Sequence, residues 1–341
     1  MRILIIRPSS IGDVVMASPV LKALKNGYKG AEIHWLINPA LIDLLRDNPY
    51  VDSLIPWNKA LWNRQIKEFH LIRLCSEIMS FKKNLSRHQY DLCLDLQGLF
   101  RSRFLAYLSR AKERIGFDSK EPGRFFMTKV ISKGPQNLEM SSEYLYMLKE
   151  LGIKVEDPLP FLVVPNVSKE RAKSIIDAHG IKGPFFVFAP FTTRPQKHWI
   201  DDRWKSLGMK LAKHYGIPSV ILGGRGDKQK GDAISNGTGN LIYNLSGKTN
   251  LVESAAIVSM AKLVIGVDTG LTHMGTAFKR PTVALFGATR PYLYTKWPKT
   301  KVLYVKRECS PCKRSPTCNQ AFPCMSDITV NMVLKTVEGI I

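Results

Sequence analysis

The chain has 341 residues, of which 45% are apolar, so it is long enough for two hydrophobic cores and too apolar to be disordered. Its 50 Lys and Arg against 28 Asp and Glu give a net charge of +22, which favours a polyanionic partner such as nucleic acid, anionic lipid or a phosphorylated substrate. No apolar run reaches the roughly 18 residues that span a bilayer, and the first residues lack a signal-peptide pattern, so we expect a cytoplasmic protein.

In the first half of the chain, short apolar runs alternate with segments of helical periodicity. The runs predict strands at 2–6, 33–37 and 91–96, and VVMASPVLKALK (14–25) predicts one helix after the first strand. Such alternation is typical of a mainly parallel sheet with helices on both faces.

The pattern stops in a polar, proline-containing stretch at 154–168 and then begins again. Four apolar runs in the second half predict strands at 185–190, 219–224, 263–268 and 282–287. We therefore expect an α/β protein with two Rossmann-like, doubly wound domains, 1–165 and 166–325, that face a central cleft, and a closing helix at 326–341.

Polar motifs follow the predicted strands, at the sheet edge where such folds bind ligands. These motifs are RPSSIGD (7–13), DLQGLFRS (95–102), APFTTRPQKHW (189–199), GVDTGLTHMGTA (266–277) and FGATRP (286–291).

The motif at 266–277 has the form of an anion site at a helix N-terminus. Gly270 allows close approach to backbone N–H groups, and the hydroxyls of Thr269 and Thr272 can donate to phosphate. Asp268 would repel phosphate, so we expect it to accept from sugar hydroxyls. The alternative is an ordinary helix cap, with His273 satisfied inside the helix.

The motif at 189–199 supplies a cation. Lys197 suits a diphosphate leaving group, unless it is an ordinary solvated surface lysine. The chain contains neither GxGxxG nor GxxxxGK[ST], which argues against dinucleotide oxidoreductases and P-loop proteins. It also lacks a DxD tripeptide for a divalent metal, so we predict a metal-independent reaction without a cofactor.

Four motifs, in order, resemble the lipopolysaccharide heptosyltransferase family: RPSSIGDVVMASP, DLQG..RS, TTRPQKHW and VDTGLTHMGTAFKRPTVALFGATRP. The resemblance covers nearly the whole chain. It implies an inverting glycosyltransferase of the GT-B type whose C-terminal domain holds the nucleotide sugar. The segment at 57–99 is also similar to the member that transfers L-glycero-D-manno-heptose from ADP-heptose to Kdo2–lipid A.

The resemblance makes Asp13 the catalytic base. Inverting transfer needs a base on the acceptor hydroxyl, and Ser9, Ser10 and Gly12 leave space there for an acceptor sugar. A carboxylate stabilised by a helix dipole is a weak base, which fits an orienting role with late proton transfer. The alternative is that Asp13 only caps the helix.

The resemblance also assigns the residues that contact the donor. Phosphate and sugar contacts fall on Thr192, Thr193 and Lys197. The diphosphate and heptose loop comprises Asp268, Thr269, Gly270, Leu271 and His273. Asp227, in the loop after the next strand, is a candidate for a ribose contact.

The acceptor implied by the resemblance is acidic, and the first half of the chain is basic. Residues 59–133 hold 16 Lys and Arg against 7 Asp and Glu. Arg64, Lys67 and Arg73 lie in one helical run with apolar residues between them, which suits an anionic membrane surface or equally a packed helix with a solvated side. Further acceptor candidates are Gln97, Arg101 and Arg124.

Three interpretations therefore compete. The first is heptose transfer to Kdo2–lipid A, the second is a related transferase with another donor or a later core position, and the third is nucleic-acid binding. The chain has no RNP-type strand, zinc finger or recognition helix to support the third. Four cysteines at 309, 312, 318 and 324 could hold zinc, but their spacing lacks a second CxxC pair, so we predict no metal site.

Overall fold

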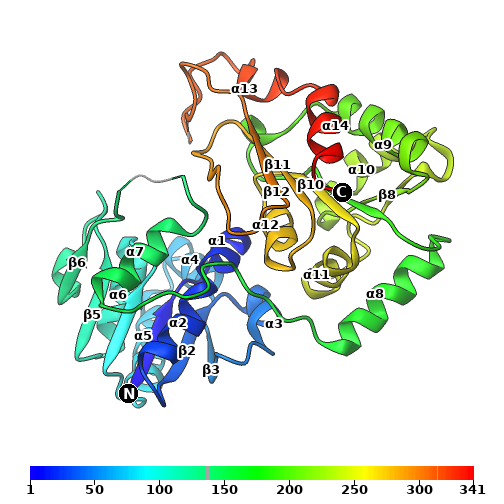
Figure 1. Ribbon diagram of the computed structural model, residues 1–341. Coiled ribbons are helices and arrows are strands. Elements are labelled where there is room, and N and C mark those ends of the chain that lie inside the picture. The colour runs from blue at the N-terminus through cyan, green and yellow to red at the C-terminus, as the bar shows by residue number, and fades with distance from the viewer. Residues whose placement is uncertain (136–137, 313) are drawn as a thin grey trace. The chain divides into compact units, whose positions relative to one another are not determined.

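The computed structural model describes residues 1–135, 138–312 and 314–341 (Figure 1). The chain forms two compact units. The first is Met1–Gln136 with Ser141–Pro158, and the second is Asn137–Met140 with Leu159–Ile341. The division lies a few residues before the boundary at 165 that the sequence suggests.

The first unit is built on a six-stranded parallel sheet in the order β3-β2-β1-β4-β5-β6. Its strands are β1 Arg2–Ile6, β2 Glu32–Ile37, β3 Ser53–Pro56, β4 Leu92–Asp95, β5 Glu113–Phe117 and β6 Lys129–Ile131. The three predicted strands are present, and the central β1 and β4 are almost fully buried. The other three strands were not predicted, because they are short and partly exposed and thus lack a continuous apolar run.

Helices cover this sheet. They are α1 Ile11–Ala17, α2 Pro19–Gly27, η1 Pro39–Leu41, α3 Ile42–Leu45, α4 Lys59–Lys67, α5 Leu71–Ser86, α6 Phe100–Leu108, η2 Arg124–Phe126 and α7 Ser142–Glu150. The prediction of one helix over 14–25 is wrong, because α1 ends before Ser18 and Pro19 starts a second helix. Proline has no N–H to donate and is favoured in the first turn, so it begins a helix more readily than it continues one.

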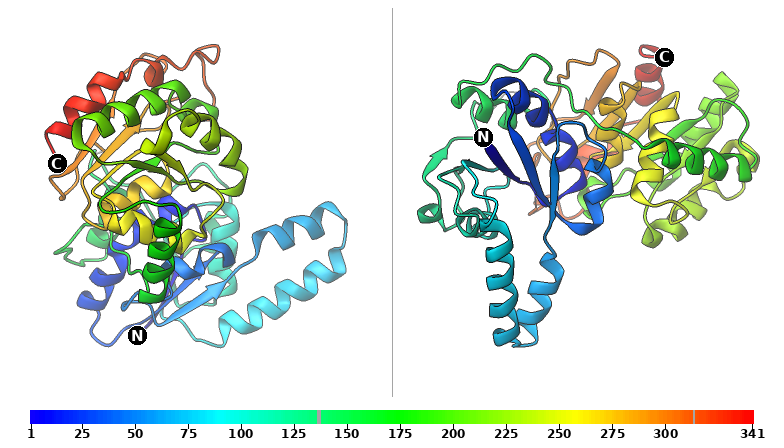
Figure 2. Two further views of the ribbon diagram at one scale, coloured as in Figure 1. Left: turned by 90° about the vertical axis from the view of Figure 1, so that its right-hand side faces the viewer. Right: turned by 90° about the horizontal axis from the view of Figure 1, so that it is seen from below.

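The basic segment of the first unit is likewise two helices rather than one helical run. α4 ends at Lys67, α5 begins at Leu71, and Phe69 between them has a positive φ of 56°. The two helices contact each other along their length and extend away from their own sheet as a pair, which both views show in light blue and cyan (Figure 2).

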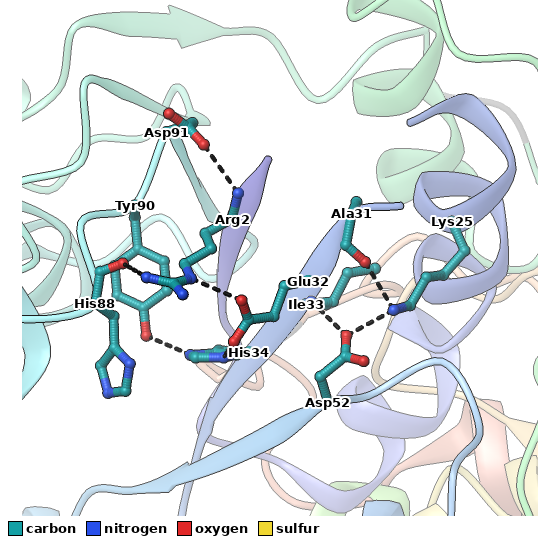
Figure 3. A network of polar contacts seen from close by, with 10 residues as sticks. All are labelled: Arg2, Lys25, Ala31, Glu32, Ile33, His34, Asp52, His88, Tyr90 and Asp91. Atoms are coloured by element: carbon teal, nitrogen blue, oxygen red, sulfur yellow. Dashed lines mark hydrogen bonds and ion pairs between the residues drawn. The ribbon is translucent and has the colours of Figure 1, made fainter. Parts of the chain in front are cut away.

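A polar network lies at the amino ends of the first unit's strands (Figure 3). Arg2 Nε bonds Glu32 Oε2 at 2.6 Å, Glu32 Oε1 lies 2.9 Å from His34 Nε2, and His34 Nδ1 lies 2.8 Å from the Tyr90 hydroxyl. The network thus joins the amino ends of β1 and β2 to Tyr90, just before β4. The predicted site motifs lie at the other end of the sheet, after the carboxyl ends of the strands.

The second unit repeats the architecture with the sheet order β12-β11-β10-β7-β8-β9, again all parallel. Its strands are β7 Phe186–Ala189, β8 Ser219–Ile221, β9 Ile242–Asn244, β10 Leu263–Val267, β11 Thr282–Phe286 and β12 Thr300–Tyr304. All four predicted strands are present. Two doubly wound sheets are therefore confirmed as the fold class.

The helices of the second unit are α8 Asn166–Ala178, η3 Pro195–Lys197, α9 Asp201–Tyr215, η4 Arg225–Asp227, α10 Lys228–Ser235, η5 Gly239–Leu241, α11 Leu251–Met260, α12 Gly270–Ala277, α13 Pro323–Ser326 and α14 Val330–Glu338. The last helix packs its buried Val333 and Val337 into the core of this unit, beside α9 and β11. Within the described part of the chain, no helix combines the length and apolarity of a bilayer-crossing segment.

Candidate active site

Two loops of the first unit lie side by side because β1 and β4 are neighbouring parallel strands. Ile6 pairs with Asp95 at their carboxyl ends, so the loop that leads to Asp13 and the loop at 95–98 leave the sheet together. The sequence motifs at 7–13 and 95–102 are thus adjacent in space.

Asp13 is held by two neighbours on its own loop. Its Oδ1 forms an ion pair of 2.6 Å with the Arg7 guanidinium, and its Oδ2 accepts 2.9 Å hydrogen bonds from the backbone N–H and the hydroxyl of Ser10. Burial alone would raise the pKa of Asp13, but the Arg7 charge and the Ser10 hydrogen bonds lower it. Asp13 therefore closes the first turn of α1, as the capping alternative requires. It also keeps 31% of its side chain exposed as an ionised carboxylate.

Sequence reasoning gave Arg7 no role, yet this side chain orients Asp13. It is almost buried, donates to the Leu96 carbonyl at 2.8 Å and lies 5.7 Å from the centre of the Tyr144 ring. A guanidinium fixed on two further sides presents its remaining N–H groups in one direction only. No spacing pattern in the sequence distinguishes this arginine from the many others.

The loop after β4 presents acceptor candidates around an inward-facing carboxylate. Asp95 is fully buried and accepts from the backbone N–H groups of Gln97 and Gly98 and from the Ser102 hydroxyl. Burial raises the pKa of Asp95 despite these bonds. The Gln97 side-chain oxygen is buried and has no hydrogen-bond partner among the described residues.

The basic acceptor candidates are spread over three elements. Arg101, at the start of α6, donates to Asn63 of α4 at 2.7 Å, whereas Arg64 and Lys67 are exposed toward the end of α4. Arg124 is exposed in η2.

Arg103 supports the loop that leads to Arg124, and sequence reasoning missed it. It is 1% exposed and donates to the carbonyls of Phe117, Glu121 and Pro122. One buried guanidinium thus satisfies the last carbonyl of β5 and two carbonyls of the irregular segment that follows. Only the fold identifies it, because the sequence shows merely one more basic residue on a helix.

In the second unit, three loops converge on Asp268, which follows the central strand β10. Lys197, from the loop after β7, forms an ion pair of 2.5 Å with Oδ2. Thr289, from the loop after β11, donates to the same oxygen at 2.5 Å. His273 of α12 places Nε2 3.2 Å from Oδ1. The strands β7, β10 and β11 are adjacent, so the motifs after them meet at one edge.

This cluster is largely closed to solvent. Asp268 and Lys197 are 14% and 15% exposed, so Lys197 is not a solvated surface lysine. Burial alone would raise the pKa of Asp268, but His273 and Lys197 hold it well below its usual range. His273 is satisfied on both ring nitrogens, since Nδ1 lies 2.9 Å from the Tyr292 hydroxyl. Thr289 lies in the motif after β11 and Tyr292 directly follows that motif, but neither residue was singled out.

The prediction that the Thr272 hydroxyl donates to phosphate is wrong. Its side chain is fully buried and its hydroxyl donates to the Val267 carbonyl at 2.6 Å. Thr269, in contrast, directly precedes α12, and Gly270 and Leu271 are the first two residues of that helix. Their backbone N–H groups belong to the first turn, which has no acceptor inside the helix.

The remaining donor candidates follow β7 and β8. Thr192 is half-buried, with its carbonyl 2.8 Å from His198 Nε2, and Thr193 is exposed. Asp227 follows β8, on the side of β7 away from β10, and its carboxylate accepts from the Gly224 backbone N–H at 2.8 Å. Among the residues that the structure describes, no group of three or more His, Cys, Asp or Glu side chains is arranged to hold a metal ion.

The chain is similar to known lipopolysaccharide heptosyltransferases. The chain is 26% identical to lipopolysaccharide heptosyltransferase 1 of Pseudomonas aeruginosa, over 93% of this chain and 87% of that protein. It is 24% identical to lipopolysaccharide heptosyltransferase 2 of Salmonella typhimurium, over 100% and 99%. The solved E. coli heptosyltransferase WaaC with ADP-2-deoxy-2-fluoro heptose superposes with a TM-score of 0.74 at 24% identity, covering 99% of each chain, which confirms the GT-B fold.

Residues 78–322 match glycosyltransferase family 9 (heptosyltransferase), a stretch that contains most of the site motifs. The resemblance found in the sequence is therefore confirmed, and the chain belongs to glycosyltransferase family 9 and is a glycosyltransferase.

Proposed function

We propose that this protein transfers L-glycero-D-manno-heptose from ADP-heptose to a Kdo residue of Kdo2–lipid A, with inversion at the anomeric carbon. The observation that carries the proposal is Asp13, a partly exposed, ionised carboxylate at the carboxyl edge of the first sheet in a family 9 chain. Support for the donor comes from the related E. coli heptosyltransferase, whose structure holds the ADP-heptose analogue ADP-2-deoxy-2-fluoro heptose.

In this reaction the bond between the anomeric carbon and the diphosphate breaks, and its electron pair leaves with ADP. The acceptor hydroxyl oxygen bonds to the opposite face of that carbon, and its proton goes to Asp13. The low pKa of Asp13 makes it a weak base, so the proton moves late, when the sugar has oxocarbenium character and the hydroxyl has become acidic. Arg7 and Ser10 orient the carboxylate until then.

The donor side of the proposal rests on the Asp268 cluster. Lys197 and the first N–H groups of α12 stabilise the leaving diphosphate, with Thr192, Thr193 and Thr269 as hydroxyl donors. Asp268 holds Lys197 in place and accepts from heptose hydroxyls. His273 acts through Asp268, because both of its ring nitrogens already have partners. Asp227 stays a candidate for the ribose, although it already caps its own turn.

The acceptor side rests on the first unit's basic surface. Gln97 offers an unsatisfied amide oxygen, while Arg101, Arg124, Arg64 and Lys67 offer positive charge to Kdo carboxylates and lipid A phosphates. A lipid-anchored acceptor places the enzyme at the cytoplasmic face of the inner membrane. We propose peripheral association with that anionic surface.

A second candidate is transfer of a later core heptose. It is favoured by the likeness to a heptosyltransferase 2 that spans the whole chain at nearly the same identity. The two functions share the donor and differ in the acceptor, so acceptor choice separates them. Nucleic-acid binding gains no support from the comparisons.

The deciding experiment measures ADP release from ADP-heptose with two acceptors, Kdo2–lipid A and Kdo2–lipid A that already carries one heptose. Turnover with the first acceptor alone supports the proposal, and turnover with the second alone favours the later core position. UDP- and GDP-sugars serve as donor controls. Activity should survive EDTA, because the chain has no DxD motif, and an EDTA loss that Mg²⁺ restores would contradict the metal-independent mechanism.

A further inference from the structure

The turn between α4 and α5 exposes large apolar side chains, which we call the apolar tip: Ile66, Phe69, Leu71 and Ile72. Phe69 and Ile72 are 84% and 90% exposed, and the other two are about half exposed. Single exposed apolar residues are common on protein surfaces, but here four lie within seven positions at one turn. Such a patch marks an interaction surface.

The exposure of the apolar tip does not result from loose packing. The helices are tied together near the turn by Gln65, which is 2% exposed and donates to Glu77 at 2.5 Å. Farther from the turn, Trp62 packs edge-to-face on Trp57 and on Phe81. The helix pair is thus a rigid support that carries the apolar tip away from its own sheet (Figure 2).

The backbone conformation at Phe69 also indicates that the apolar tip is an interaction surface. Its φ of 56° lies in the left-handed region, where glycine and asparagine are favoured and a bulky aromatic residue is rare. The turn is closed by the His70 N–H, which donates to the Gln65 carbonyl at 2.9 Å. A position that would suit glycine instead carries an exposed aromatic ring, which indicates that the ring itself has a use.

Positive charge flanks the apolar tip. Residues 59–88 contain seven Lys and Arg and two Asp and Glu. Arg64 and Arg73 are 66% and 73% exposed, and Lys67 is exposed beside them. The two acids, Glu68 and Glu77, each lie 4.0 Å from one of these arginines. An apolar end with a basic collar is complementary to a bilayer with anionic headgroups, and not to an acidic protein surface without apolar groups.

We propose that the apolar tip inserts into a bilayer that contains anionic lipid. Phe69 and Ile72 enter the boundary between headgroups and acyl chains, and Arg64, Lys67 and Arg73 contact headgroup phosphates. This inference deepens the proposed function, on which its biological role rests, by naming the residues that anchor the enzyme beside a lipid-linked acceptor. Insertion differs from purely electrostatic attraction to a charged surface, because burial of the apolar side chains contributes binding free energy that salt does not screen.

The first experiment measures insertion directly on the full-length protein. Phe69→Trp and Met79→Trp variants are mixed with phosphatidylethanolamine–phosphatidylglycerol vesicles whose acyl chains carry bromine, which quenches nearby tryptophan. Met79 is the matched control, since it is 62% exposed on α5 and lies about 12 Å along that helix from Leu71, next to the turn. We expect extra quenching at position 69 only. Equal quenching at both positions would overturn insertion.

The second experiment measures the energetic contribution of the apolar tip. In vesicle sedimentation at raised salt, Phe69→Ser with Ile72→Ser should weaken binding by at least about tenfold. Met79→Ser should bind like the wild type. Unchanged binding of the double variant would overturn the proposal and leave the apolar tip as a surface for a protein partner.

A third measurement separates this inference from the proposed function. The double variant should lose turnover with Kdo2–lipid A embedded in vesicles but keep wild-type turnover with a deacylated, water-soluble acceptor. Loss with both acceptors would mean that the apolar tip serves something other than membrane insertion. If the wild type shows no heptosyl transfer at all, the proposed function fails while the two vesicle measurements still decide insertion.

Discussion

Asp13 and Asp268 each lie beyond the carboxyl end of a central strand of their own sheet, β1 and β10, yet their surroundings differ. Both partners of Asp13 come from its own loop, Arg7 and Ser10, and nearly a third of its side chain stays exposed. Asp268 is enclosed by side chains from two other loops and from helix α12, and it is 14% exposed. An open carboxylate with local partners suits proton transfer, whereas an enclosed one suits the fixing of a cation.

The largest expected effect is the loss of turnover when the open carboxylate, Asp13, is replaced. Asp13→Asn keeps the size of the side chain but removes the base, so turnover should fall at least about 100-fold. ADP-heptose binding should stay close to wild type, because Asp13 belongs to the other unit from the donor cluster. Turnover assays and calorimetric titration of donor check this. A variant that retains more than about a tenth of wild-type turnover would disprove the base assignment.

The second largest effect is the loss of stability when the enclosed carboxylate, Asp268, is replaced. Asp268→Ala leaves Lys197 and His273 without their shared partner in a buried place, which should lower the free energy of unfolding by about 3 kcal/mol. Donor binding should weaken as well. Asp227→Ala is the control in urea denaturation, since it removes a local cap and should cost about 1 kcal/mol. Equal losses in both variants would show that the Asp268 cluster contributes nothing special.

A third prediction uses pH to sharpen the comparison. Because Lys197 and His273 lower the pKa of Asp268 in the folded state, its contribution to stability is complete above the unfolded-chain pKa of about 3.9 and is lost as pH falls below that value. The stability difference between wild type and Asp268→Asn should shrink as the pH falls from about 5 to below about 4. Urea titrations across this range measure it. A difference that grows on acidification would contradict the assigned ion pair.

The smallest effect tests how far the enclosure extends. Tyr292→Phe removes only the hydroxyl 2.9 Å from His273 Nδ1, so unfolding free energy should fall by about 1 kcal/mol. The KM for ADP-heptose should change little, because Asp268 keeps Lys197 and Thr289. Steady-state kinetics and thermal melts suffice. A large rise in KM would place Tyr292 against the donor itself.

Apolar periodicity was enough to predict the buried strands but not the edge strands. The four residues after Arg2 in β1 and all of LVIGV are free of charged residues, whereas ERIGF begins with two charged residues and TKVLY contains a lysine. These last two strands lie at or near sheet edges. Helix breaks were missed where the apolar pattern continued across them, at Pro19 and at Phe69.

The candidate site was likewise only partly predictable from the sequence. Loops could be predicted because parallel strands bring their carboxyl ends together, but partners within those loops could not. Lys197 and Asp268 are 71 residues apart, and nothing in either motif indicates their ion pair. Arg7, Arg103 and Tyr292 act through buried geometry that exists only once the chain is folded.

The excursion of residues 138–140 has a consequence for dissecting the protein. This short segment bonds to Leu293 and Tyr294 of the second unit, and the chain then returns to the first unit for α7. A single cut at residue 158 would therefore leave residues 138–140 on the N-terminal fragment. The C-terminal fragment would then lack the segment that bridges to Tyr294. Independent expression of the halves calls for a circularly permuted or grafted design that returns this tripeptide to the second half.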